Sequence, residues 1–117
     1  MIYIASPYSD PSDAMQYERF LLARNYAVSL MNSGFICFSP IAYGRQFQKQ
    51  YDMGGDFETW LEFNNKMMHA SSYIHVLMLP GWDKSRGVAY EIAFATRNSI
   101  PVARITCAPK ESARGNI

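Results

Sequence analysis

The residues best suited to chemistry form one short stretch, Ser85-Arg86-Gly87, followed four residues later by Glu91. An apolar run ending at Leu79 precedes them, and a helical run of small residues follows. The start of such a helix offers free backbone N–H groups and a positive dipole end, which suit a phosphate. Glu91 lies about one helical turn beyond Gly87 and can face the same opening. A carboxylate placed there could attack the anomeric carbon of a sugar and form a covalent glycosyl intermediate.

Each of these residues also has an ordinary structural explanation. Acidic side chains are common in first helical turns because they complement the dipole, although a capping box begun by Ser85 would place its acid at Val88. Ser85 could simply cap the helix, and Arg86 could be a solvated surface arginine. On the residues alone, structural and functional roles for Glu91 both stay open.

A second group of polar side chains lies at the first apolar segment. Residues 1–5 predict a strand that contains Tyr3, and Ser6, Tyr8 and Ser9 lie in the loop after it. The carboxyl ends of parallel strands share one edge, so this loop and the loop before Glu91 are expected to border one crevice. A tyrosine inside a strand is more often a core residue, but a buried hydroxyl needs a hydrogen-bond partner.

Strands and helices alternate along the whole chain. The short apolar segment 35–38 is typical of a strand buried on both faces, as in parallel sheets covered by helices. Right-handed crossovers predict the strand order 2-1-3-4. The predicted fold is therefore α/β, a small doubly wound, flavodoxin- or Rossmann-like three-layer sandwich with a four- to five-stranded parallel sheet. The expected elements are strand 1–5, helix 11–32 capped by Asp10, strand 35–38, a short helix within the loop 41–55, helix 56–70 capped by Asp56, strand 73–79, helix 88–97 and strand 102–106.

Composition predicts one globular domain over residues 1–117, with a loose polar tail from about 108. The net charge is +1, so we expect no nucleic acid polymer as partner, and no apolar run approaches the ~20 residues of a membrane span. Met1 leads directly into an apolar strand without a basic segment, so we expect no signal peptide and a cytoplasmic location. Cys37 and Cys107 are expected to be buried free thiols.

Several common cofactor and catalytic motifs do not occur in the sequence. No G-x-G-x-x-G follows the first strand, no Walker A segment is present, and no serine lies in a nucleophile elbow. The two cysteines and two histidines do not have the spacing of metal ligands, and His75, in a strand with apolar neighbours, is most simply a structural residue. We therefore expect no cofactor and no metal.

Three segments together resemble the nucleoside 2-deoxyribosyltransferase-like superfamily, and within it a branch found in phages and bacteria. The segments are Ile2 to Ser9, Phe38 to Ile41 and Leu79 to Glu91, and the resemblance covers about residues 1–106. It implies cleavage of an N-glycosidic bond in a deoxynucleoside or deoxynucleotide, by hydrolysis or base transfer. Glu91 would be the nucleophile, and Tyr3 would position its carboxylate. A homo-oligomer is also implied, because the superfamily often completes its site from a neighbouring subunit.

The resemblance also suggests the substrate. Ser85 lies six residues before Glu91, where transferases acting on nucleosides tend to carry an aspartate and nucleoside monophosphate hydrolases carry a phosphate-binding serine. A 2′-deoxyribonucleoside 5′-monophosphate is therefore the expected substrate, in the host cytoplasm if the chain is phage-encoded. The predicted binding residues are Ser6, Tyr8, Asp56, Ser85, Arg86 and Gly87.

Two departures from the superfamily pattern concern the acid that protonates the leaving base. An aspartate is usual just before the third strand, where this chain has Ser71-Ser72, and the nearest branch tends to have an aspartate at Asn64. Asp56, Asp83 or water would then have to assist. The alternative is a non-catalytic nucleotide-binding module, a sensor or scavenger, and a weaker one is a structural oligomer built on the aromatic segment 43–51.

Overall fold

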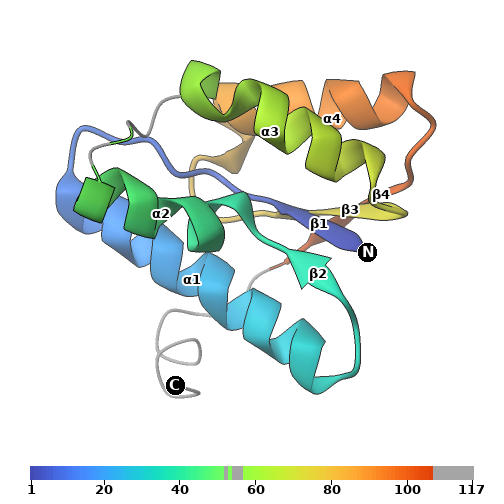
Figure 1. The fold of residues 1–117 in the computed structure, drawn as a ribbon, viewed down its shortest axis with the longest axis horizontal. Helices are drawn as coiled ribbons and strands as arrows, with labels where there is room; N and C mark the ends of the chain where they lie inside the picture. Colours follow the sequence, from blue (N-terminus) through green and yellow to red (C-terminus); the bar gives the residue numbers. More distant parts are fainter. Residues whose placement is uncertain (52, 54–56, 107–117) are drawn as a thin grey trace.

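A four-stranded, all-parallel sheet forms the centre of the molecule (Figure 1). The computed structural model describes residues 1–51, 53 and 57–106. The predicted α/β class and the predicted strand order are both confirmed, because the sheet has the order β2-β1-β3-β4. The strands are β1 (Ile2–Ala5), β2 (Cys37–Phe38), β3 (Tyr73–Leu77) and β4 (Val102–Ile105).

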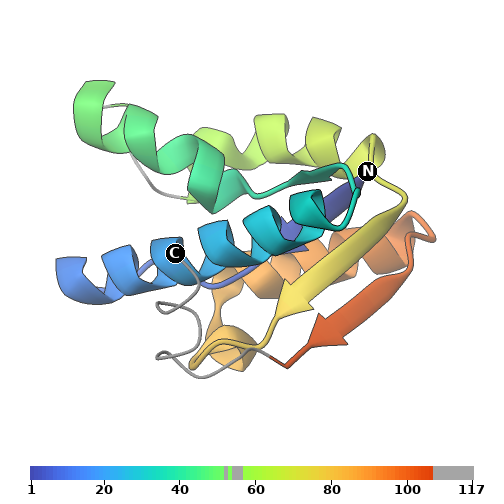
Figure 2. The ribbon, with the colours of Figure 1, turned by 90° about the horizontal axis from the view of Figure 1, so that it is seen from below.

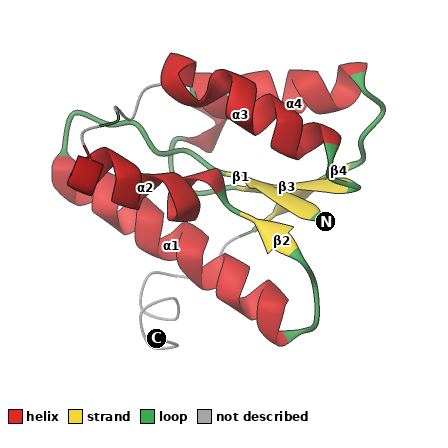
Figure 3. Ribbon diagram, in the orientation of Figure 1, coloured by secondary structure: helices red, strands yellow, loops and turns green. Residues whose placement is uncertain are grey.

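Helices cover both faces of this sheet, as a doubly wound fold requires (Figure 3). Helix α1 (Asp13–Asn32) lies on one face, with α2 (Pro40–Tyr51) packed along it. Helices α3 (Phe57–His69) and α4 (Arg86–Arg97) lie on the other face. In Figure 2, the view from below, α1 is in front of the sheet. A short 3-10 helix, η1 (Trp82–Lys84), joins β3 to α4. No helix in the described ranges is both long and apolar enough to cross a membrane.

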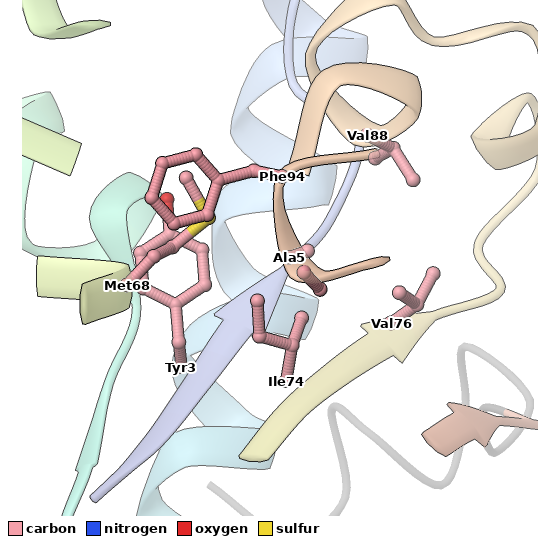
Figure 4. Packing of buried hydrophobic residues seen from close by; sticks show 8 residues of the cluster. Tyr3, Ala5, Met68, Ile74, Val76, Val88 and Phe94 are labelled. Carbon is pink, nitrogen blue, oxygen red and sulfur yellow. The ribbon is translucent and has the colours of Figure 1, made fainter. Parts of the chain in front are cut away.

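Alternate side chains of the strands build a separate core on each face, because successive strand residues point to opposite sides. Toward α3 and α4, the strand residues pack with Met68, Val88 and Phe94 (Figure 4). Toward α1, Ile4 and Leu77 pack with alanines of that helix. Trp82 of the loop between β3 and α4 is partly buried against the first of these clusters.

The register of the two central strands places the predicted crevice. β1 pairs with β3 from Ile2↔Tyr73 to Ala5↔Val76, so the two strands end side by side. The loop after β1 leads to α1 on one face, and the loop after β3 leads to α4 on the other. This divergence opens a gap at the carboxyl edge of the sheet, which is the usual place for a ligand in α/β folds.

The start of α1 differs from the prediction. The helix begins at Asp13 rather than at Pro11, and its N-cap is Ser12, whose hydroxyl accepts a hydrogen bond from Met15 N–H at 3.2 Å. Asp10, the predicted cap, instead accepts from the backbone N–H of Ser12 at 2.9 Å. Both residue types favour the cap position, and the side chain that reaches the free helical N–H decides.

The segment around β2 also differs from the prediction. Only Cys37 and Phe38 are in the strand, and Ile36 is 75% exposed, so the prediction of a strand buried on both faces was wrong. The physical reason is that β2 is an edge strand of the sheet. Cys37 is half-buried and forms no disulfide within the described chain.

The predicted short helix within 41–55 is longer and begins earlier, at Pro40. Ser39 accepts a hydrogen bond from Ala42 N–H at 3.1 Å and so stabilises the first turn. Aromatic side chains of α2 then contact α3, with Tyr43 stacked on Phe63 at a centroid distance of 5.5 Å. The predicted cap Asp56, the residue Cys107 and the predicted tail lie outside the described residues.

Candidate functional site

A cavity of about 440 Å³ opens at the carboxyl edge of the sheet. The loop after β1 contributes Ser6 and Tyr8, and the beginning of α4 contributes Ser85 and Glu91. Helices α2 and α3 complete its walls. The structure therefore brings together five of the predicted binding residues, namely Ser6, Tyr8, Ser85, Arg86 and Gly87, with Glu91.

A buried hydrogen bond joins the two predicted catalytic residues. The Tyr3 hydroxyl donates to Oε2 of Glu91 at 2.5 Å, and the two side chains come from residues 88 positions apart in the chain. Tyr3 has no solvent exposure, and Glu91 is 8% exposed while still lining the cavity. Oε1 of Glu91 makes no hydrogen bond to any residue of the described chain. One carboxylate oxygen is thus held, and the other has no hydrogen-bond partner among the described residues.

Burial governs the protonation of this pair. It raises the pKa of Glu91 from 4.5 to about 8, although the hydrogen bond from Tyr3 acts in the opposite direction. Burial and the nearby Glu91 charge raise the pKa of Tyr3 well above its ordinary value. The carboxyl group is therefore mostly neutral at pH 7. Pocket carboxyl groups with such shifted pKa values are typical of functional sites.

Ser85 caps α4 and also lines the cavity. It is the N-cap of α4, and its hydroxyl accepts a hydrogen bond from Val88 N–H at 3.2 Å. The ordinary explanation of this serine as a cap is thus correct. Gly87 lines the cavity beside it, in the first turn of α4, where backbone N–H groups are still free of helical partners.

Arg86 reaches across the cavity mouth to α3. Its Nη2 lies 2.6 Å from Oε1 of Glu58, and both side chains are more than half exposed, at 74% and 58%. Both residues also line the cavity. Exposed ion pairs contribute at most about 1 kcal/mol, so an anionic ligand could compete for this arginine.

Two residues that the sequence did not reveal lie beside Tyr8. Its hydroxyl accepts from Arg45 Nη1 at 2.8 Å and donates to Gln48 Oε1 at 3.0 Å. Arg45 and Gln48 are three positions apart on α2 and so share a helical face that lines the cavity. That spacing was visible in the sequence, but it could point to the cavity only once the full length of this helix was known.

Two oxygens that belong to cavity-lining residues are buried without a partner. Within the described ranges, Ser6 Oγ and Asn64 Oδ1 have almost no solvent contact and form no hydrogen bond. Buried polar atoms are nearly always paired, so orphan atoms of this kind call for an explanation. A site that changes shape when a ligand enters is one such explanation.

The structure brings neither Ser71, which occupies the usual position of the acid, nor Asp83 to the described cavity. Ser71 donates to the carbonyl of Met67 at 2.8 Å and does not line the cavity. Asp83 is exposed in η1 and does not line it either. Asp56 lies outside the described residues, so its predicted role is not addressed. In the part of the chain that is described, the cavity carboxyl groups are those of Glu58 and Glu91.

Comparison with known families assigns the chain. Residues 1–106 match DUF1937, a domain of unknown function. The chain belongs to the DUF1937 family. Among curated proteins, none matches it. The match spans all four strands and all four α-helices, and with them every residue of the cavity described above.

In this DUF1937 chain, one arginine joins the two loops that border the cavity. Arg19 of α1 donates through Nη1 to the carbonyl of Ser9 at 2.8 Å and through Nη2 to that of Pro80 at 3.1 Å. Gly81 follows with φ +88, and a Cβ there would lie 2.9 Å from Arg19 Nη2. The left-handed backbone conformation therefore favours glycine at this position, and a side chain there would also require the end of the flexible Arg19 side chain to shift.

Proposed function

We propose that the protein cleaves the N-glycosidic bond of 2′-deoxyribonucleoside 5′-monophosphates, with Glu91 as the nucleophile. The observation that carries the proposal is the buried hydrogen bond between Tyr3 and Glu91 at the wall of the cavity. The resemblance to the nucleoside 2-deoxyribosyltransferase-like superfamily assigns the same two residues these roles. Both arguments lead to one carboxyl group.

The environment of Glu91 suits a reaction in which positive charge develops. Burial disfavours the free carboxylate, as the pKa of about 8 indicates. As the bond between C1′ and the base breaks, the sugar acquires oxocarbenium character. That positive charge favours the anion, so the carboxylate is stabilised more in the transition state than in the free protein.

The proposed reaction has two steps. Oε1 of Glu91, ionised, forms a bond to C1′ while the electron pair of the C1′–N bond leaves with the base. Water then attacks C1′, restores the carboxylate and supplies the proton that the base requires. The products are the free base and deoxyribose 5-phosphate. A second base in place of water would give transfer instead of hydrolysis.

The charges of the cavity favour a monophosphate over a nucleoside. Arg45, Lys84 and Arg86 line it, against Glu58 and a mostly neutral Glu91. A phosphate dianion would complement this excess of positive charge, and the N-terminus of α4 offers backbone donors for it. Ser85 and Gly87 are the proposed phosphate ligands, with Arg86 exchanging Glu58 for the phosphate.

The decisive experiment is incubation of the purified protein with deoxynucleosides and their 5′-monophosphates, followed by chromatography of the released base. We expect release from monophosphates and little from nucleosides. Release only after addition of a second base would identify a transferase. Absence of release under all conditions, at pH 7 and at pH 9, would refute the enzymatic proposal.

One observation favours the alternative of a nucleotide-binding module. Of the two carboxyl groups that line the described cavity, Glu58 is ion-paired and Glu91 is assigned to attack. Neither is available to protonate the base. A binding module predicts a rise in melting temperature with a monophosphate, by the usual linkage of binding to stability, without release of base.

A further inference from the structure

We propose that Arg45 binds the leaving base through a carbonyl oxygen and stabilises the negative charge that the base acquires. The substrates would then carry an oxo base such as guanine or hypoxanthine in preference to adenine. This inference rests on the proposed function and adds to it a base class and a residue for the departing group.

Arg45 has more hydrogen-bonding capacity than the protein uses. A guanidinium group carries five N–H donors, and the hydrogen bond that Arg45 donates within the described chain goes from Nη1 to the Tyr8 hydroxyl at 2.8 Å. No carboxylate of the described residues lies within ion-pair distance of it, although the pKa of Asp13, lowered mainly by the hydrogen bond with Lys49, is lowered further by its charge. A half-buried guanidinium at a cavity wall, with donors that no described residue accepts, can offer them to acceptor atoms of a ligand.

Its position is fixed by aromatic rings. The guanidinium carbon lies 5.9 Å from the ring centroid of Tyr8, 5.3 Å from that of Tyr17 and 5.5 Å from that of Phe20. Tyr8 is further held by its hydrogen bond to Gln48. Such packing limits the rotamers of a long side chain, so the donors are oriented before a ligand arrives.

The wall that carries Arg45 lies opposite the proposed phosphate site. Arg45 belongs to α2, which packs along α1, whereas Ser85 caps α4 and Glu91 lies within α4, on the other face of the sheet (Figure 1). Both walls border one cavity. A nucleotide with its phosphate at the start of α4 and its C1′ at Glu91 would therefore extend its base toward α2.

Among its described residues, the cavity offers no carboxylic acid that is available to protonate the leaving base. A guanidinium group can stabilise the departing base in place of that acid. When the C1′–N bond breaks, the electron pair delocalises over the base and onto its carbonyl oxygen. The guanidinium group of Arg45 stabilises this oxyanion as a charged donor while water supplies the proton. Adenine has no carbonyl group, and its exocyclic amino group is itself a donor that would face the guanidinium donors.

The test compares dGMP with dAMP in the wild type and in R45K, R45M and R24K. Arg24 provides a matched control because it also lies over the Phe20 ring, at 5.5 Å, but does not line the cavity. We expect the wild type to prefer dGMP, and R45K and R45M to lose about 10- to 100-fold in kcat/KM for dGMP. The kcat/KM for dAMP should change less than threefold, and R24K should behave as the wild type.

A loss of equal size for dGMP and dAMP in the Arg45 variants would overturn the inference, because Arg45 would then contact the sugar or the phosphate. Equilibrium binding of both nucleotides to the wild type and to R45K separates this inference from the proposed function. If the wild type releases no base, the proposed function fails. A binding preference for dGMP that R45K abolishes would still support recognition of the carbonyl group, and equal binding of the two nucleotides would overturn it.

Discussion

Each face of the sheet contains a tyrosine hydroxyl bonded to a titratable side chain, but only one of the two pairs borders the described cavity. On one face Tyr3 donates to Glu91 at 2.5 Å, and on the other the Tyr26 hydroxyl lies 2.7 Å from His75 Nδ1. Burial shifts the pKa of both partners toward the neutral form, upward for Glu91 and downward for His75. Glu91 borders a cavity, whereas neither member of the second pair does.

The comparison separates a functional pair from a structural one by its surroundings. A shifted pKa reports burial and indicates chemistry only where a ligand can reach the group. His75 packs against the Tyr26 ring of α1 and does not line the cavity, so we assign its hydrogen bond to packing, as the sequence suggested. Matched substitutions in the two pairs test this distinction.

The largest effect is expected from E91Q. An amide cannot form the glycosyl ester, so release of base should fall by roughly 10³-fold or more while nucleotide binding changes little. H75Q, its counterpart on the other face, should retain the wild-type rate. Steady-state kinetics and equilibrium binding check both variants. Wild-type turnover by E91Q would remove Glu91 from the mechanism.

Replacing Tyr3 or Tyr26 with phenylalanine should show which hydroxyl positions a catalytic group and which serves only packing. The hydrogen bond from Tyr3 lowers the pKa of Glu91, so Y3F should raise this pKa further and move the pH dependence of kcat/KM to higher pH. A tenfold weaker acid has about one tenth of the ionised fraction at pH 7, so the rate at neutral pH should fall in proportion. Y26F should leave the pH profile unchanged. Identical profiles for Y3F and the wild type would contradict the positioning role.

The free energy of unfolding should depend on pH with opposite slopes for Glu91 and His75, which lie on opposite faces of the sheet. Glu91 has a folded pKa above its unfolded value, so its contribution is complete below pH 4.5 and is lost as the pH rises toward 8. His75 has a folded pKa below 6.5, so its contribution is present above pH 6.5 and is lost as the pH falls. Urea unfolding across this range should show that E91Q flattens the alkaline slope and H75Q the acid slope. Parallel curves for all three proteins would contradict the assignment.

The smallest effect concerns the orphan oxygens at the cavity. Because Ser6 Oγ and Asn64 Oδ1 are buried without partners in the described chain, S6A and N64L should leave the free energy of unfolding unchanged or raise it by up to about 1 kcal/mol. Both should weaken nucleotide binding. Thermal melting with and without a monophosphate measures the two quantities together. A marked loss of stability would mean that these atoms have structural partners.

The strand order and the pairing of Tyr3 with Glu91 could be predicted, the first from general rules of parallel sheets and the second from the resemblance of short motifs. The N-cap of α1 and the exposure of the segment beside the edge strand β2 could not be predicted. Asp10 and Ser12 are both good cap residues, and only the geometry of the loop selects Ser12. Ile36 looks like a core residue, but it is exposed beside an edge strand.

The two walls of the cavity also differ in how far the sequence predicts them. Residues at the start of α4 are contiguous with their strand and loop, so their position follows from the sequence. Arg45 and Gln48 reach the cavity through the packing of α2, which no short motif encodes. Arg86 was assigned to phosphate without knowledge of Glu58, its partner from a distant segment.

The guanidinium group of Arg19 also restricts the motions of the two loops that border the cavity. It donates hydrogen bonds to the carbonyls of Ser9 and Pro80, so one side chain links two loops that are 71 residues apart in the chain. We therefore expect the fluctuations that admit or release a small molecule to be largest on the side of α2 and α3. Amide exchange should accordingly be slow and concerted in both loops, and R19M should let each loop exchange at its own rate.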